Sequence, residues 1–111
     1  MGTKYRVGIS VQLGGQAFGN SMEYWRLVND TITATLGDEN WASSGTGFGC
    51  RDVDYIYDTE TEGRAAYNLL LSALADNFVI EALWLEKETQ ITDEDTEGNV
   101  LLSYDKEETV H

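Results

Sequence analysis

The sequence contains no proline, one cysteine and one histidine in 111 residues. The single cysteine, Cys50, excludes an intramolecular disulfide and any zinc site built from several cysteines. The only histidine is the last residue, His111, so Ser-His and Cys-His nucleophile pairs have no suitable base. The sequence therefore does not indicate an enzyme, and we expect no catalytic residues, no cofactor and no metal.

Basic residues are also scarce, with seven lysines and arginines against twenty aspartates and glutamates, for a net charge of −13. The imbalance lies entirely in the second half of the chain. Residues 1–51 carry four acids and four bases, whereas residues 52–111 carry sixteen acids and three bases. This segregation predicts one strongly negative flank, which repels nucleic acid and anionic membranes and attracts basic surfaces.

Long apolar runs are absent as well. No window approaches the roughly 20 apolar residues of a membrane span, and the segment Met1–Ser10 has no apolar core of a secretory signal. We therefore expect a cytoplasmic chain that forms one domain over residues 1–111, with an α+β core over 1–90 and an acidic hairpin and tail over 91–111.

Two segments alternate between apolar and polar residues with the period of a half-buried strand, Tyr5–Leu13 and Arg51–Asp58. A third strand is predicted over Phe78–Glu88. Weaker signals predict a short strand near Trp41–Ser44, and a turn over Thr96–Asn99 that leads into a returning strand over Val100–Tyr104.

Two helices are predicted between these strands. The first begins at Asn20 or Ser21 and ends at Gly37, with an apolar stripe of Trp25, Val28, Ile32 and Leu36. The second follows a capping box, Thr59 to Glu62, and should end near Asn77. Its predicted buried stripe consists of Ala66, Leu69, Leu70, Ala73 and Leu74.

This order of elements is the βαββαβ pattern of a ferredoxin-like sandwich, an α+β fold in which two helices cover one face of an antiparallel sheet. In that arrangement the first and third strands are neighbours in the centre of the sheet. The alternative is a sheet that lacks the weak second strand and is closed by the C-terminal hairpin.

The face of the sheet away from the helices is the first candidate site. The predicted fold places three aspartates there, Asp52, Asp54 and Asp58, and it turns the strand tyrosines toward the core. RNA-recognition sheets carry exposed aromatics on these strands, so we expect no direct nucleic-acid binding. The aspartates instead form a candidate partner-binding surface, and the aromatic residues Trp41 and Phe48 are candidate anchors. The alternatives are a solvated face or one covered by a second subunit.

Two glycine-rich segments are the second candidate site. Neither matches a dinucleotide-binding or Walker A pattern, and a flexible connection and a tight turn are the simpler interpretations. If the two segments lie together beside Arg51, they can bind a small phosphate-bearing ligand. The candidate ligand-binding residues are Gly14, Gly15, Gly45, Gly47, Gly49 and Arg51.

Two further patterns lead to structural expectations. Asp93, Asp95, Glu97 and Gly98 resemble the opening of a calcium-binding loop, but Tyr104 stands where a bidentate glutamate is required, so we expect no metal site. The two tryptophans in apolar stripes, Trp25 and Trp84, are expected in the core.

Composition and pattern together favour a small acidic, non-enzymatic binding or inhibitor protein that acts on a basic, nucleic-acid-binding protein partner. Small viral inhibitors of host defence share this general character. The alternative is a nucleotide-binding or other small-ligand protein, and a third hypothesis is adaptation to high salt, which the neutral first half disfavours. A monomer or a homodimer is expected.

Overall fold

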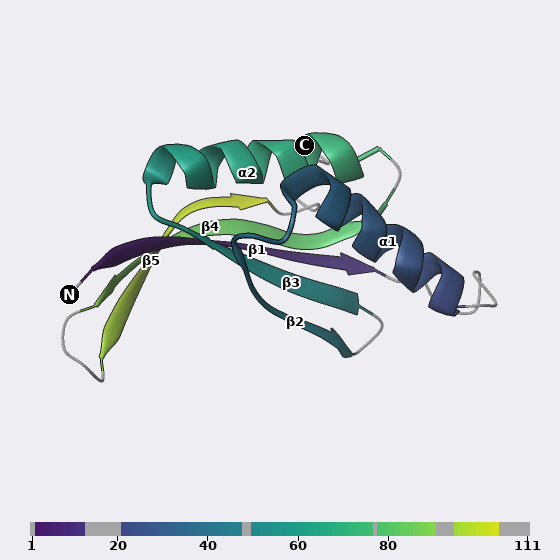
Figure 1. Cartoon of the computed structure of the whole chain (residues 1–111), viewed down its shortest axis with the longest axis horizontal. Helices are drawn as coiled ribbons and strands as arrows, with labels where there is room; N and C mark the ends of the chain where they lie inside the picture. Colours follow the sequence, from purple (N-terminus) through teal and green to yellow (C-terminus); the bar gives the residue numbers. More distant parts are fainter. Residues whose placement is uncertain (1, 13–20, 48–49, 77, 91–94, 105–111) are drawn as a thin grey trace.

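The computed structural model describes residues 2–12, 21–47, 50–76, 78–90 and 95–104. It contains two helices and one antiparallel sheet whose strands lie in the order β2-β3-β1-β4-β5 (Figure 1). The α+β class is therefore confirmed, as is the central pairing of the first and third strands. The elements are β1 (Thr3–Gln12), α1 (Ser21–Leu36), β2 (Trp41–Gly47), β3 (Cys50–Tyr57), α2 (Glu60–Leu74), β4 (Ile80–Gln90) and β5 (Thr96–Tyr104).

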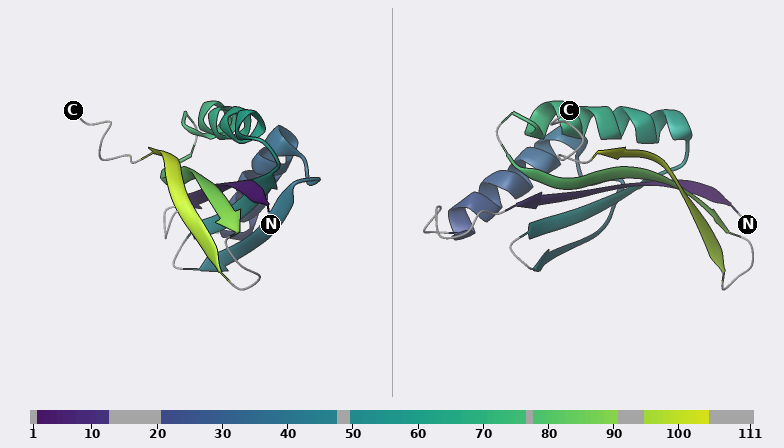
Figure 2. Two further views of the ribbon diagram at one scale, coloured as in Figure 1. Left: turned by 90° about the vertical axis from the view of Figure 1, so that its left-hand side faces the viewer. Right: turned by 180° about the vertical axis from the view of Figure 1, so that it is seen from behind.

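Both helices lie on the same face of the sheet, and the core fills the space between the two layers (Figures 1 and 2). Strand β1 contributes Val7, Ile9 and Val11, each with no exposed surface. Because strand side chains alternate between faces, this burial turns the intervening residues of β1 away from the helices. The alternation predicted for the first strand is thus confirmed.

Helix α1 has the predicted stripe, with Val28 and Ile32 buried against the sheet. It also contains threonines, which are poor helix formers because of their branched Cβ atoms. The Thr31 and Thr35 hydroxyls each donate a 2.7 Å hydrogen bond to the carbonyl four residues earlier, which satisfies them within the helix. The helix ends as predicted at Gly37, which has a positive φ of 74°.

Helix α2 begins with the predicted capping box. The backbone N–H of Glu62 donates to the Thr59 hydroxyl, and that hydroxyl donates to the Glu62 carboxylate at 2.9 Å. The helix ends at Leu74 with Ala75 as its C-cap, before the expected Asn77, which itself lies outside the described residues.

The buried stripe of α2 is rotated from the expected one. Leu69 is 52% exposed, whereas Gly63 and Tyr67 are buried. A Cβ atom at Gly63 would lie 2.8 Å from Leu85 Cδ1, so this glycine allows the helix to approach β4 closely.

The two edge strands are longer than predicted. Strand β5 begins at Thr96, so the segment Thr96–Asn99 is paired with β4 and is not a turn. Strand β2 extends to Gly47 and includes Gly45, which pairs with Asp52. The alternative fold without a second strand is therefore wrong.

Candidate functional site

The face of the sheet opposite the helices carries the candidate site, and we call it the open face. No described element covers it (Figure 2). The pairing register places residues of three adjacent strands on it, most of them polar. They are Lys4, Arg6, Gly8, Ser10 and Gln12 from β1, Asp52, Asp54 and Ile56 from β3, Asp58 directly after β3, and Ala82, Trp84, Glu86 and Glu88 from β4.

Arg6 is the centre of a charge cluster on this face. Its Nη1 lies 3.1 Å from Asp54 Oδ2, and its Nε lies 2.9 Å from Glu88 Oε2. The hydrogen bond to Glu88 is the largest cause of the raised pKa of Arg6, and desolvation opposes it. Arg6 therefore holds together carboxylates from the strands on either side of β1.

Glu86 is the third carboxylate of this cluster, because it stands opposite Arg6 in the β1–β4 register. A Cβ atom at Gly98 would lie 2.9 Å from Glu86 Cδ, so the carboxyl group lies against the backbone of β5. Desolvation raises the pKa of Glu86, and the hydrogen bond and like charge of Glu88 raise it further, while Arg6 lowers it.

The open face is negative overall. Lys4 forms an ion pair with Asp58, and Asp52 is exposed. The five carboxylates named here thus face two cations, an excess of three negative charges when all are ionised. The three aspartates predicted from sequence do share a face, and β4 adds Glu86 and Glu88, which were not predicted. The sequence pattern that could have indicated Glu86 and Glu88 is the alternation of β4, where Leu83 and Leu85 are fully buried.

Trp84 also lies on the open face, so its expected place in the core is wrong. It pairs with Gly8 across β1 and β4. A Cβ atom at Gly8 would lie only 2.1 Å from Trp84 Cζ2 and 2.4 Å from Cε2, so the indole lies flat on the glycine backbone. Glycine inside a strand is typical of such a close approach.

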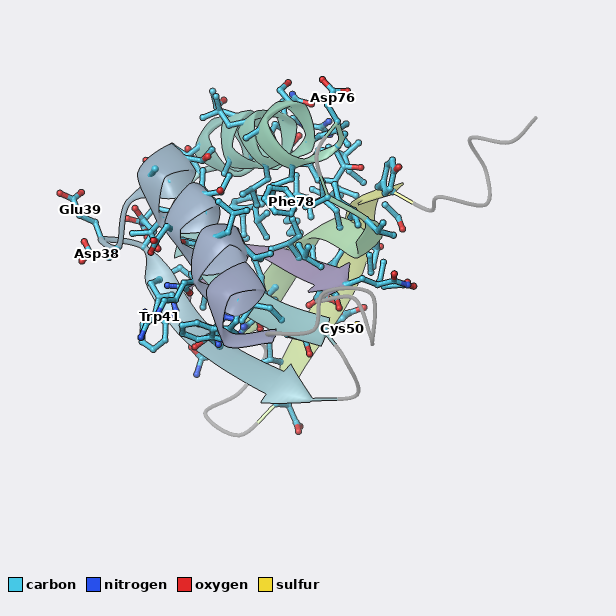
Figure 3. All side chains as sticks on the ribbon, turned by 90° about the vertical axis from the view of Figure 1, so that its right-hand side faces the viewer. Asp38, Glu39, Trp41, Cys50, Asp76 and Phe78 are labelled. Atoms are coloured by element: carbon cyan, nitrogen blue, oxygen red, sulfur yellow. The ribbon has the colours of Figure 1, made fainter. Side chains whose placement is uncertain are left out.

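Trp41, one of the two predicted aromatic anchors, does not join this surface. Trp41 pairs with Tyr55, which faces the helices, and its 50% exposed side chain projects outward beside α1, near Asp38 (Figure 3). Phe48 lies outside the described residues.

The structure describes only part of the predicted glycine site. Gly45 and Gly47 are paired within β2, and Gly14, Gly15 and Gly49 lie outside the described residues. Arg51 is on the helix side of the sheet, because it pairs with the buried Val11.

Arg51 instead borders a pocket of about 300 Å³ between α1 and the β2–β3 edge. Its Nη2 donates to Asn29 Oδ1 at 2.9 Å, and its guanidinium carbon lies 4.8 Å from the centroid of the Trp25 ring. Desolvation lowers the pKa of Arg51, and the charge of Asp52 partly offsets this. The walls also include Thr33, Asp38, Trp41 and Tyr55.

Among the described residues, no group of three or more His, Cys, Asp or Glu side chains is placed to hold a metal ion. Glu97 and Gly98 belong to strand β5, so they do not form a calcium-binding loop, and Asp93 lies outside the described residues. Cys50 is half-buried in β3.

Comparison with known proteins finds no matching family model, and no curated protein or solved structure is significantly similar to the chain. In the described parts of the chain, no helix is both long and apolar enough to cross a membrane.

The raised pKa of Glu86 leads to a test of the cluster. Because the pKa of Glu86 is raised, the folded state binds a proton at this carboxyl group more tightly than the unfolded chain does. The fold therefore gains stability as the pH falls through the raised pKa, and the full gain is present below the ordinary value of 4.5. We expect Glu86→Gln to raise the free energy of unfolding at neutral pH by about 0.5 kcal/mol. Urea unfolding between pH 4 and pH 8 measures it, and a loss of stability at neutral pH would contradict the arrangement.

Proposed function

We propose that the chain is a non-enzymatic binding protein whose open face docks on a basic surface of a partner protein. The observation that supports this proposal most strongly is the excess of carboxylates on an uncovered face formed by β3, β1 and β4. Carboxylates aligned on neighbouring strands present a dense negative field, and such a field accelerates association with positively charged clefts. The proposed role is an inhibitor that occupies a nucleic-acid-binding site in place of phosphates, as small viral inhibitors do.

The arrangement of the first four strands supports a finer proposal for the fold. Strands β2, β3, β1 and β4 follow one another in the sheet, and the two helices share one face (Figure 1). This is the arrangement that a ferredoxin-like sandwich requires, and β5 extends it at the β4 edge. We propose that β5 widens the open face, because Gly98 provides the surface against which Glu86 lies.

Two variants with the same net charge test the docking surface. The open-face variant carries Asp52→Asn, Asp58→Asn and Glu86→Gln. Its matched control carries Asp30→Asn, Glu39→Gln and Asp76→Asn, which are exposed residues of the helix layer; Figure 3 shows Glu39 and Asp76 projecting outward from it. Because each exposed ion pair contributes about 0.5 kcal/mol, losing three should weaken partner binding about tenfold.

The measurement is affinity capture from a cell lysate with wild type and both variants as bait, at low and at high salt. We expect wild type and the control variant to retain the same basic proteins and the open-face variant to lose them. High salt should release these proteins, because charges more than about 10 Å apart are strongly screened at 0.1 M. A captured set that the open-face variant retains in full would contradict the proposal.

The pocket beside Arg51 favours a second candidate function, the binding of a small phosphate-bearing ligand such as a nucleotide. Its volume is within the range of ligand pockets, and it combines a guanidinium with the ring of Trp41. If a nucleotide binds there, a panel of nucleotides should include one that raises the melting temperature of wild type but not of Arg51→Gln. A panel that leaves the wild-type melting temperature unchanged would exclude this function.

A further inference from the structure

The indole of Trp84 has one covered face and one outward face. Three of its ring atoms lie within 2.6 Å of the position that a Cβ atom at Gly8 would take, so the backbone of β1 covers the inner face directly. The residue is nevertheless only half-buried. The exposed part of an aromatic ring lying flat on a sheet is its outer face, which carries the negative side of the ring quadrupole.

Carboxylates flank this ring on two sides. Gly8 pairs with Asp54 on β3 and with Trp84 on β4, so Asp54, Gly8 and Trp84 form one row across the sheet. Glu86 is two residues further along β4 and therefore faces the same side. The exposed Asp52 is two residues from Asp54 on β3 and faces the same side. A group that settles on the indole thus meets an aromatic surface below it and the carboxylates of Asp54 and Glu86 beside it, next to Arg6, which already bonds Asp54.

We propose that the open face recognises an arginine side chain of the partner, whose guanidinium stacks on the outer face of Trp84 between the carboxylates of β3 and β4. The inference rests on the proposed function and names the residue type that this function selects. Arginine is favoured over lysine because its planar, weakly hydrated guanidinium stacks on aromatic rings and bonds carboxylates with two parallel N–H groups. The chain already contains such a contact, between Arg51 and Trp25 at 4.8 Å.

The test compares oligoarginine and oligolysine peptides of equal length and charge, with binding to the full chain measured by calorimetry at low salt. Wild type should bind oligoarginine about two- to fivefold more tightly. Trp84→Leu should reduce the ratio of the two affinities to about one and leave the affinity for oligolysine unchanged. Trp84→Phe should retain part of the preference for oligoarginine. The matched control is Trp41→Leu, an exposed tryptophan on the opposite side of the sheet, which should leave the ratio unchanged.

The outcomes separate the two proposals. If neither peptide binds wild type, the proposed function and the arginine site both fail. If both peptides bind with equal affinity, or if Trp84→Leu keeps the wild-type ratio, only the arginine site fails. If Trp84→Leu does not fold, the indole N–H resonance of Trp84 is followed by NMR in the wild-type chain. The arginine site requires this resonance to shift more with oligoarginine than with oligolysine, and a resonance that does not move overturns the arginine site.

Discussion

Gly8→Ala is expected to lower the free energy of unfolding by about 1–3 kcal/mol, the usual cost of forcing extra atoms into occupied space. The new Cβ atom would lie 2.1 Å from Trp84 Cζ2, so the indole must leave the backbone of β1. Its displacement exposes aromatic surface and removes the contact that fixes the ring on the open face. Urea unfolding gives the free energy, and tryptophan fluorescence reports the change in ring environment.

The control for this prediction is Gly45→Ala. Gly45 is also a strand glycine of the same sheet, but a Cβ atom there meets nothing within 4 Å. Its replacement should be neutral or stabilising by about 0.4–1 kcal/mol, because alanine restricts the unfolded chain more than glycine does. Equal effects of the two substitutions would show that Trp84 does not rest on Gly8.

The second large effect is expected from Arg6→Met, which should destabilise the fold by about 1.5–3 kcal/mol at neutral pH. Arg6 donates to Asp54 at 3.1 Å and to Glu88 at 2.9 Å, and hydrogen bonds to charged groups have contributions of this size. Without the guanidinium, these carboxylates and Glu86 repel one another on adjacent strands. Desolvation and the neighbouring Glu88 raise the pKa of Glu86, so acid protonates Glu86 and relieves part of the repulsion, and the deficit should shrink as the pH is lowered.

Arg64→Met is the matched control because it removes the same charge from an exposed i,i+4 pair with Glu60 on α2. Such pairs contribute about 0.3–0.5 kcal/mol. Chemical unfolding of both variants at several pH values measures the difference. If Arg6→Met cost no more than Arg64→Met, the ion cluster would not organise the open face.

Local pattern was sufficient to predict much of the fold. The strict alternation of β1 indicated its buried side, and Thr59 with Glu62 marked the beginning of α2. These features depend on neighbouring residues in the sequence, so the sequence displays them directly. The row of Asp52, Asp54 and Asp58 was predicted for the same reason.

The rest of the site depends on contacts between distant residues. Phe78 and Val79 precede Ile80 without alternation, which concealed the face to which Trp84 belongs. Gly98 and Asn99 resemble turn residues, yet they pair with Glu88 and Lys87 within β5. That a strand glycine packs against a side chain of the neighbouring strand can be recognised only once the register between the strands is known.

The sharpest test of the account is an NMR titration of the uniformly ¹⁵N-labelled wild-type chain with oligolysine, which maps where a basic partner binds. We expect amide shifts concentrated in β1, β3 and β4, centred on Asp54, Trp84 and Glu86, and reversed by salt. Shifts concentrated on the helix layer, around Asp30, Glu39 and Asp76, would contradict the assignment of the open face as the functional surface.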